Sequence, residues 1–135
     1  MLELAVLLAW VAVGSALGGV ARFFVSGVVA RAVGETFPWG TMVVNATGSV
    51  AIGVLAALAE PHVLPSGAGT WSLAVTGFLG SYTTVSSFSL QTLALAREGQ
   101  WGRAGGNVVL SLLLCLPAAG FGIVATQAAM AGGPP

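Results

Sequence analysis

The chain contains very few charged residues. Only 6% of its 135 residues are charged, namely four arginines and four glutamates, and there is no lysine and no aspartate. Because soluble domains have about 25% charged residues, this composition excludes an ordinary soluble protein. Since 56% of the residues are hydrophobic and the mean hydropathy is +0.96, we predict an integral membrane protein. The net charge of zero also gives no electrostatic basis for nucleic-acid binding, which requires a basic patch.

Side chains that commonly carry catalysis or bind transition metals are also scarce. The single cysteine, Cys115, cannot form an internal disulfide, and in its apolar surroundings we interpret it as a small packing residue. The single histidine, His62, lies in a predicted turn over residues 60–70, where we expect it to be exposed. Because no His or Cys can act as general base for a serine nucleophile, we expect no enzymatic activity.

Long stretches with little or no charge predict a single all-α membrane domain over residues 1–135 with four transmembrane helices. Short segments rich in Gly, Pro and charged residues separate these stretches, and Pro38 suits the first turn of the second helix. We expect helices at about residues 4–31, 38–59, 71–98 and 104–130, the third of them broken near residues 80–83.

The predicted break lies in the stretch Gly77–Ser89, GFLGSYTTVSSFS. Glycine loosens the backbone, and serine and threonine hydroxyls compete with the helix for backbone hydrogen bonds. Inside a membrane, an interrupted backbone is tolerated only where protein covers it or a wet cavity lines it. Such interruptions are typical of ion sites, which is the function we favour for this stretch. The alternative is that its small residues only allow close helix packing.

Polar residues form stripes on two other predicted helices. Spacings of four place Thr41, Asn45 and Ser49 on one face of the second helix, and Asn107 and Ser111 on one face of the fourth. A buried amide in lipid requires hydrogen-bond partners, so Asn45 either lines an ion pathway or bonds to a neighbouring helix. We favour the ion pathway because Asn45 belongs to a whole polar stripe.

Arg22 follows a GxxxG pair, Gly14 and Gly18, on one face of the first predicted helix. A charged side chain at the centre of a bilayer costs at least about 2.5–3.5 kcal/mol. Arg22 therefore either extends to the membrane interface or faces a watery vestibule, where it would attract anions. The sequence leaves both roles open.

The polar side chains of these helices favour a small anion as the solute. No acidic residue lies in a predicted helix centre, so the helices offer no proton carrier and no carboxylate for a cation. Hydroxyl and amide groups donate hydrogen bonds to anions, and the edges of aromatic rings are electropositive. The residues alone leave fluoride, chloride and a neutral polar solute open. A proton-coupled small four-helix exporter, the alternative transporter, would need a carboxylate inside the membrane.

Several motifs, in their order and spacing, resemble the small fluoride channels of the Fluc (CrcB) family over nearly the whole chain. The resemblance implies four helices per subunit, an antiparallel dimer of oppositely oriented subunits, and two pores. It also implies passive, selective fluoride export through the cell membrane, which protects the cell from fluoride. The matching stretches are GGVARF at Gly18–Phe23, PWGTMVVNATGS at Pro38–Ser49, GSYTTVSSFS at Gly80–Ser89, and Asn107 with Ser111.

The resemblance also implies roles for individual residues. A buried structural sodium ion on the dimer axis would be held by backbone carbonyls of Gly80 and Thr83 from each subunit. The phenylalanine pair that faces fluoride falls at Val85 and Phe88, so one ring edge is missing, and Gln91 stands where an acidic residue often follows. The polar stripes and the resemblance together predict a fluoride pathway comprising Arg22, Thr41, Asn45, Ser49, Val85, Phe88, Asn107 and Ser111.

The placement of the arginines bears on the partner subunit. The predicted loops after the first and third helices lie on one side and hold Arg31, Arg97 and Arg103, whereas the opposite side has no Arg or Lys. The positive-inside rule places these loops in the cytoplasm and both termini outside. A chain with one fixed orientation needs an oppositely oriented partner, so this bias favours a heterodimer with a paralogous subunit. If three arginines are too few to fix the orientation, the chain can insert both ways and form a homodimer. Both partners remain open, as does a non-conducting role for this chain in such a heterodimer.

Overall fold

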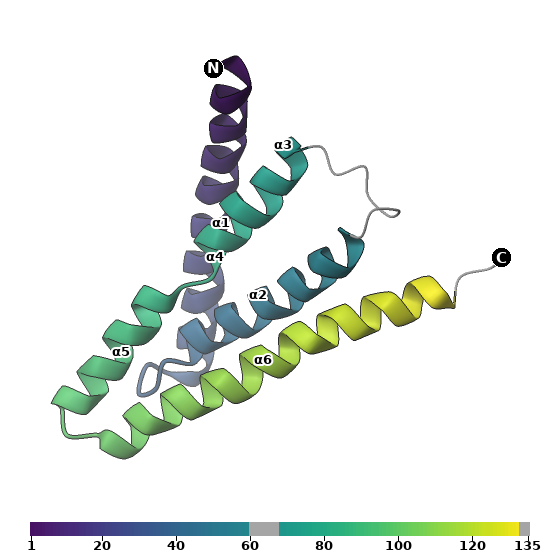
Figure 1. The fold of residues 1–135 in the computed structure, drawn as a ribbon. Helices are drawn as coiled ribbons and strands as arrows, with labels where there is room; N and C mark the ends of the chain where they lie inside the picture. Colours follow the sequence, from purple (N-terminus) through teal and green to yellow (C-terminus); the bar gives the residue numbers. More distant parts are fainter. Residues whose placement is uncertain (60–67, 133–135) are drawn as a thin grey trace.

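The chain forms only helices and short connections in the residues that the structure describes, 1–59 and 68–132 (Figure 1). This computed structural model therefore confirms the all-helical class predicted from the sequence. Residues 60–67 of the turn predicted over residues 60–70, His62 among them, lie outside the described residues.

Among the described residues, 3 helices are long and apolar enough to cross a membrane. Their ends differ from the predicted bounds by one to three residues. Pro38 lies at the N-cap of the second helix, one residue before its first helical residue, and not in the first turn. The three helices are α1 (Leu2–Val33), α2 (Trp39–Leu58) and α6 (Trp101–Ala131).

The third helical segment is divided by two extended residues. Thr83 has φ −76° and ψ 160°, and Thr84 has φ −154° and ψ 121°, so neither continues the helix. The sequence predicted a break near residues 80–83. The structure has it at Thr83, the last of these residues, and at Thr84, which follows. What we call the first half comprises α3 (Ala68–Trp71), the π-helix η1 (Ser72–Leu79) and α4 (Gly80–Tyr82), and the second half is α5 (Val85–Arg97).

Two expectations for this segment were wrong. The segment begins at Ala68 and not near Trp71, so the end of the predicted turn is helical. Gly80, at which we placed the start of the break, is helical with φ −61° and ψ −29°. Its N–H bonds to carbonyls of η1, including that of Val75, so the π-helix carries the chain past the glycine without interruption.

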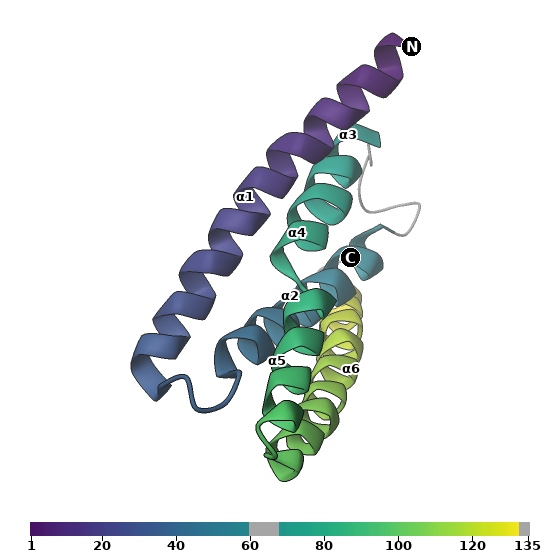
Figure 2. The same cartoon turned by 90° about the vertical axis from the view of Figure 1, so that its left-hand side faces the viewer.

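The two halves pack against different helices. The first half lies along α1, α5 lies along α6, and α2 contacts both of these pairs (Figure 1, Figure 2). A Cβ atom on Gly14 would lie 2.2 Å from the Leu73 carbonyl oxygen, and one on Gly18 would lie 2.2 Å from that of Phe78. Because such contacts are impossible, α1 can approach the backbone of the first half only where it carries glycine.

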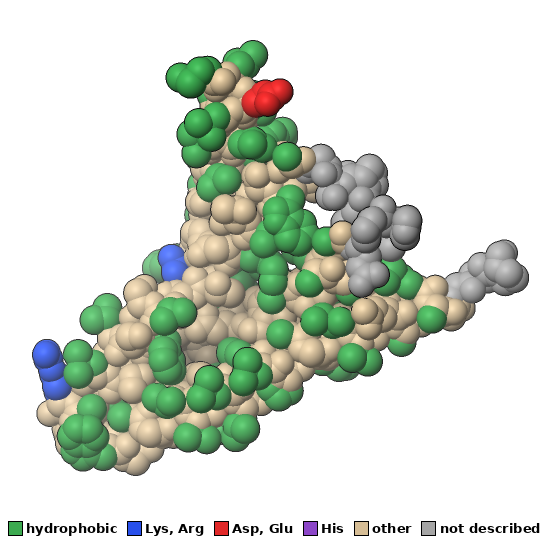
Figure 3. All heavy atoms as spheres, in the orientation of Figure 1, with side chains coloured by type: hydrophobic (Ala, Val, Ile, Leu, Met, Phe, Trp, Pro, Cys, Tyr) green, Lys and Arg blue, Asp and Glu red, His purple; other side chains and the backbone are tan. Residues whose placement is uncertain are grey.

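Large apolar side chains lie on the outside of the molecule. Phe23, Leu113 and Phe121 are each more than half exposed, whereas the buried hydrophobic cluster is small and centres on Val44 and Leu79. Figure 3 shows apolar side chains spread over one whole face, with few charged ones among them. Exposed apolar area on this scale is unfavourable in water and suits contact with lipid or with another protein.

Candidate functional site: a helix break between two cavities

A side chain of α2 pairs with the backbone of the break. Asn45 Nδ2 donates to the Thr84 carbonyl at 2.9 Å, and the Thr84 N–H donates to Asn45 Oδ1 at 2.8 Å. The amide thus bonds to both backbone groups of one extended residue, as a neighbouring β-strand would. Thr84 is only 7% exposed, and a buried backbone group without a partner costs about 1–3 kcal/mol. Asn45 therefore stabilises the break, and its second Nδ2–H remains for another acceptor.

The break releases a backbone carbonyl from the helical ladder. In a continuous α-helix the Thr84 N–H would bond to the Gly80 carbonyl four residues earlier, but here it bonds to Asn45. Carbonyls of unwound membrane helices are typical sodium ligands. The donor set at Gly80 and Thr83 therefore fits the sodium ion expected from the resemblance. Among the described residues, no cluster of His, Cys, Asp and Glu could hold a metal ion instead.

Thr84 also caps the N-terminus of α5. Its Oγ1 accepts a hydrogen bond from the Ser87 N–H at 3.1 Å, which satisfies one of the backbone donors left free where a helix starts. The first turn of α5 contains no acidic residue, so nothing in that turn neutralises the positive end of the helix dipole. This helix end therefore attracts negative charge.

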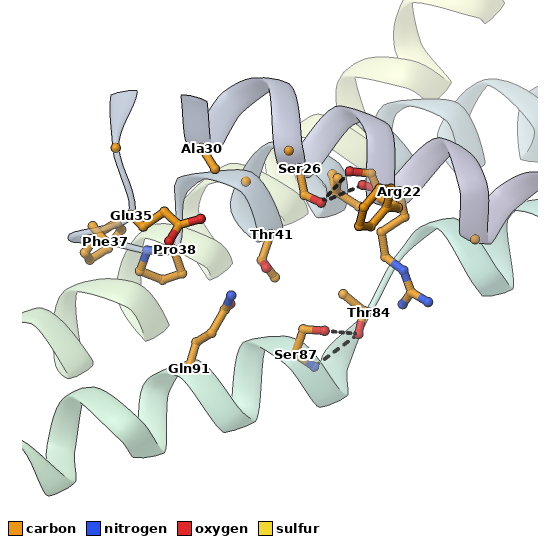
Figure 4. Close-up of a pocket in the computed structure, with 16 residues that line it drawn as sticks. Arg22, Ser26, Ala30, Glu35, Phe37, Pro38, Thr41, Thr84, Ser87 and Gln91 are labelled. Atoms are coloured by element: carbon orange, nitrogen blue, oxygen red, sulfur yellow. Dashed lines mark hydrogen bonds between the residues drawn. The ribbon is translucent and has the colours of Figure 1, made fainter. Parts of the chain in front are cut away.

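A cavity of about 670 Å³, which we call the Arg22 cavity, opens between α1, the α1–α2 loop, α2 and α5. Figure 4 shows Arg22 from α1, Thr41 from α2 and Ser87 from α5 around this space. Glu35 and Gln91 line its other end. Arg22 therefore lines a cavity, and both roles considered for it stay predictions.

A second cavity of about 410 Å³, which we call the Asn45 cavity, lies between α2, the first half, α5 and α6. No charged residue lines it; its polar groups come from Asn45, Ser49 and the residues of the break. Thr84 belongs to the lining of both cavities. Thr84, the residue whose backbone Asn45 holds, therefore lies between the two cavities.

Comparison with known proteins points to one family. A family model described as "CrcB-like protein, Camphor Resistance (CrcB)" matches residues 9–123. The chain belongs to the CrcB family. It is 57% identical over 121 residues to "Fluoride-specific ion channel FluC 2" of Rhodopseudomonas palustris (strain BisB18), covering 89% of this chain and 92% of the relative. It is 56% identical over 117 residues to "Fluoride-specific ion channel FluC" of Opitutus terrae, covering 86% of this chain and 89% of the relative.

Membership of the CrcB family and three long apolar helices together identify a multi-pass membrane protein. The predicted pathway residues of this CrcB chain do not all line one cavity. Arg22 and Thr41 line the Arg22 cavity, and Asn45, Ser49 and Val85 line the Asn45 cavity, whereas Phe88, Asn107 and Ser111 lie on α5 and α6 outside both linings.

Asn107 connects α6 to α5 by hydrogen bonds. It is 1% exposed, and its Nδ2 donates to Thr92 Oγ1 at 2.8 Å. Thr92 Oγ1 in turn donates to the Phe88 carbonyl at 2.7 Å. This chain of bonds links the amide of one helix to the backbone of the residue at the predicted aromatic position.

The sequence analysis did not single out three residues that the structure places at the site. Thr92 bonds to Asn107, and Thr47 and Tyr82 bond to each other beside the break. Tyr82 is the only tyrosine in the chain, and its position next to two threonines was a signal that could have been used. Thr47 and Thr92 carry no such signal, because their partners are distant in the sequence.

Proposed function

We propose that the chain is a subunit of a passive, fluoride-selective channel that exports fluoride through the cell membrane. The observation that carries the proposal is the position of Thr84, which lines both cavities and is held by the amide of Asn45. The choice of fluoride is supported by the relatives, which are named fluoride-specific ion channels. The proposed activity is therefore conduction and not an enzymatic reaction.

The two cavities differ in a way that suits an anion pathway. Arg22 would raise the local anion concentration at its own end of the cavity, away from Glu35 at the other end. Beyond Thr84, only neutral donors remain, including the free N–H of Asn45. Such donors replace part of the hydration shell that a fluoride ion loses on entering. Because they carry no fixed positive charge, they bind the ion weakly enough for it to leave again.

We also propose that the third segment serves as a fourth, broken span and that two chains pair in antiparallel orientation. Support comes from the outer side of the break, where Val85 is 76% exposed next to the polar lining of the Asn45 cavity. Irregular backbone at membrane depth is not tolerated against lipid. A second subunit that covers this side would remove that exposure.

A structural sodium ion at the centre of this dimer is part of the proposal. Bound there, sodium would supply positive charge to the carbonyls of Gly80 and Thr83. This chain holds Thr83 in place through its N–H and its Oγ1, which both donate to the Leu79 carbonyl, at 3.0 Å and 2.9 Å. We expect the unfolding temperature of the purified protein to fall when sodium is replaced by a large organic cation, since a ligand of the folded state stabilises it.

The partner is either a second copy of the chain or a paralogous subunit. Arg103 Nη1 lies 3.5 Å from the Thr36 carbonyl, which brings the arginine-bearing loops to one end of the molecule. Three arginines at this end against none in the described residues at the other would favour one orientation and so a heterodimer, whereas a bias this small would still allow both orientations and so a homodimer. Robust fluoride efflux from the chain reconstituted alone would exclude the need for a paralogue.

The test of the proposed function is fluoride release from liposomes that contain only the purified chain. We expect a fluoride electrode to record release down the fluoride gradient, with no requirement for a proton gradient. Release that occurs only with an imposed proton gradient would favour the exporter. If fluoride is retained, and co-reconstitution with a paralogous subunit gives efflux that the substitution N45A leaves unchanged, the chain is a non-conducting partner.

A further inference from the structure

A hydroxyl pair joins the break to α2 at a second point. The Tyr82 hydroxyl lies 2.9 Å from Thr47 Oγ1. The Thr47 hydroxyl donates its own hydrogen to the Val43 carbonyl at 2.8 Å, so Tyr82 is the donor in the pair. Tyr82 is 9% exposed, and its ring stacks on Phe78 with centroids 5.8 Å apart. Neither hydroxyl residue belongs to the lining of the two cavities described above.

The two attachments to α2 lie on opposite sides of the break. Asn45 holds Thr84, the last extended residue before α5, whereas Thr47 holds Tyr82, the last residue of α4. Between them, the backbone of α2 makes room for Thr83, since a Cβ atom on Gly48 would lie 2.3 Å from Thr83 Cγ2. One short stretch of α2 therefore contacts the break over its whole length.

This arrangement has a mechanical consequence. With Asn45 alone, α2 would hold only Thr84, and the position of the first half relative to it would depend on the packing of that half against α1. With Tyr82 also attached, both ends of the two-residue break are fixed to the same continuous helix. The two attachments then set the direction in which α5 starts relative to the first half. They also set the position of the backbone N–H groups at the N-terminus of α5.

We propose that Tyr82 and Thr47 are positioning residues for conduction, which act by fixing the break and touch no ion. The inference rests on the proposed fluoride-channel function and deepens it. The Tyr82 ring packs on Phe78, whereas its hydroxyl makes the bond to α2. Tyr82 therefore contributes through its hydroxyl and not only through its ring. Thr47 contributes as the acceptor of that hydroxyl.

A double-mutant cycle tests the pair. Y82F keeps the ring and removes the hydroxyl, and T47V keeps the shape of the side chain and removes the acceptor. We expect each substitution to lower the fluoride efflux rate about fivefold, the factor typical of one hydrogen bond, and the double variant to be no slower than either single one. T47S, which restores the acceptor, should regain the wild-type rate.

The chain offers a matched control. Thr126 on α6 makes the same bond to the carbonyl four residues earlier, at 2.8 Å, as Thr47 makes to Val43. T126V should therefore leave the efflux rate unchanged. Independent effects that multiply in the double Y82F T47V variant would overturn the proposal, as would a loss of efflux explained entirely by less folded protein.

Hydrogen exchange supplies a measurement that does not depend on transport. The Thr84 amide should exchange about fivefold faster in Y82F than in the wild type, because its bond to Asn45 opens more often, while the unfolding temperature stays the same. Unchanged exchange at Thr84 would refute the positioning role. If the wild-type chain conducts no fluoride either alone or with a paralogous subunit, the proposed function fails, and the exchange rates still decide whether Tyr82 fixes the break.

Discussion

The two halves of the third segment belong to one stretch of chain, yet they pack in opposite ways. The first half meets α1 backbone to backbone, at Gly14 and Gly18 of α1 and Gly77 of η1. The second half, α5, meets α6 through a hydrogen bond between side chains, from Asn107 to Thr92. Toward its neighbouring long helix, the first half is therefore held by close backbone contact and the second half by a polar bond between side chains.

This difference explains why the break can serve as a site. Glycine contacts seat the first half firmly without placing polar groups near the break. On the other side, hydroxyl and amide groups continue from Thr84 into α5 and α6, where they bond to one another and to the backbone. Asn45 of α2 stands where the two kinds of packing meet. The predictions below disturb one side of this comparison at a time.

The largest effect is expected for G18A. A Cβ atom at this residue would lie 2.2 Å from the Phe78 carbonyl oxygen and 3.0 Å from the Tyr82 nitrogen. Because both are backbone atoms that cannot move aside, the cost exceeds the ~1–3 kcal/mol of ordinary overpacking. We expect nearly complete loss of monodisperse protein in size-exclusion chromatography. G106A is the control, because no atom lies within 4 Å of its Cβ position. A normal yield of G18A would mean that the contact between α1 and the first half is not as close as described.

N45A should lower the fluoride efflux rate about a hundredfold while the protein still folds. It leaves both backbone groups of Thr84 without their partner, and each such group costs about 1–3 kcal/mol. The measurement is the initial rate from a fluoride electrode, normalised to the amount of folded protein. A variant that conducts like the wild type would show that conduction past Thr84 does not depend on this amide.

N107L tests the polar packing of the second half. It replaces a buried amide by an apolar side chain of similar size and breaks the bond to Thr92. We expect about tenfold slower efflux, because the Thr92 hydroxyl loses its partner and α5 is less well held. The companion variant T92V should have the same effect, and combining the two should add little. Additive losses would indicate that the two residues act separately.

The smallest effect is expected for T84V, which removes the N-cap of α5 and keeps the backbone bonds to Asn45. Loss of such a cap costs about 1 kcal/mol, so we expect about fivefold slower efflux. T84S retains the hydroxyl and should behave like the wild type. Equal efflux rates for T84V and T84S would show that conduction does not depend on the N-cap hydrogen bond.

Much of the fold could be predicted from the sequence, because lipid imposes simple rules. Uncharged stretches long enough to cross a bilayer gave the three long helices to within a few residues. The cluster of glycine and hydroxyl residues also predicted that the third segment would be interrupted. The interruption lies at Thr83 and Thr84 and not at Gly80, because a threonine that caps the next helix determines where that helix starts.

The partners within the site could not be predicted in the same way. Asn45 and Thr84 are 39 residues apart, and Thr47 and Tyr82 are 35 apart, so no local pattern connects them. The π-helix has no recognisable sequence signature either, yet it carries the chain through Gly80. The eight predicted pathway residues fell into separate groups because a shared helix face does not specify which cavity that face lines.

The most direct test of the central claim compares two anions in the same liposomes. Vesicles with the wild-type chain are loaded with both fluoride and chloride, and the release of each is recorded by its own electrode. The groups beside Thr84, including the second N–H of Asn45, are few, close together and neutral, which suits a small anion. Fluoride should therefore leave the vesicles while chloride stays inside. Equal release of the two ions, or release of chloride alone, would contradict the account.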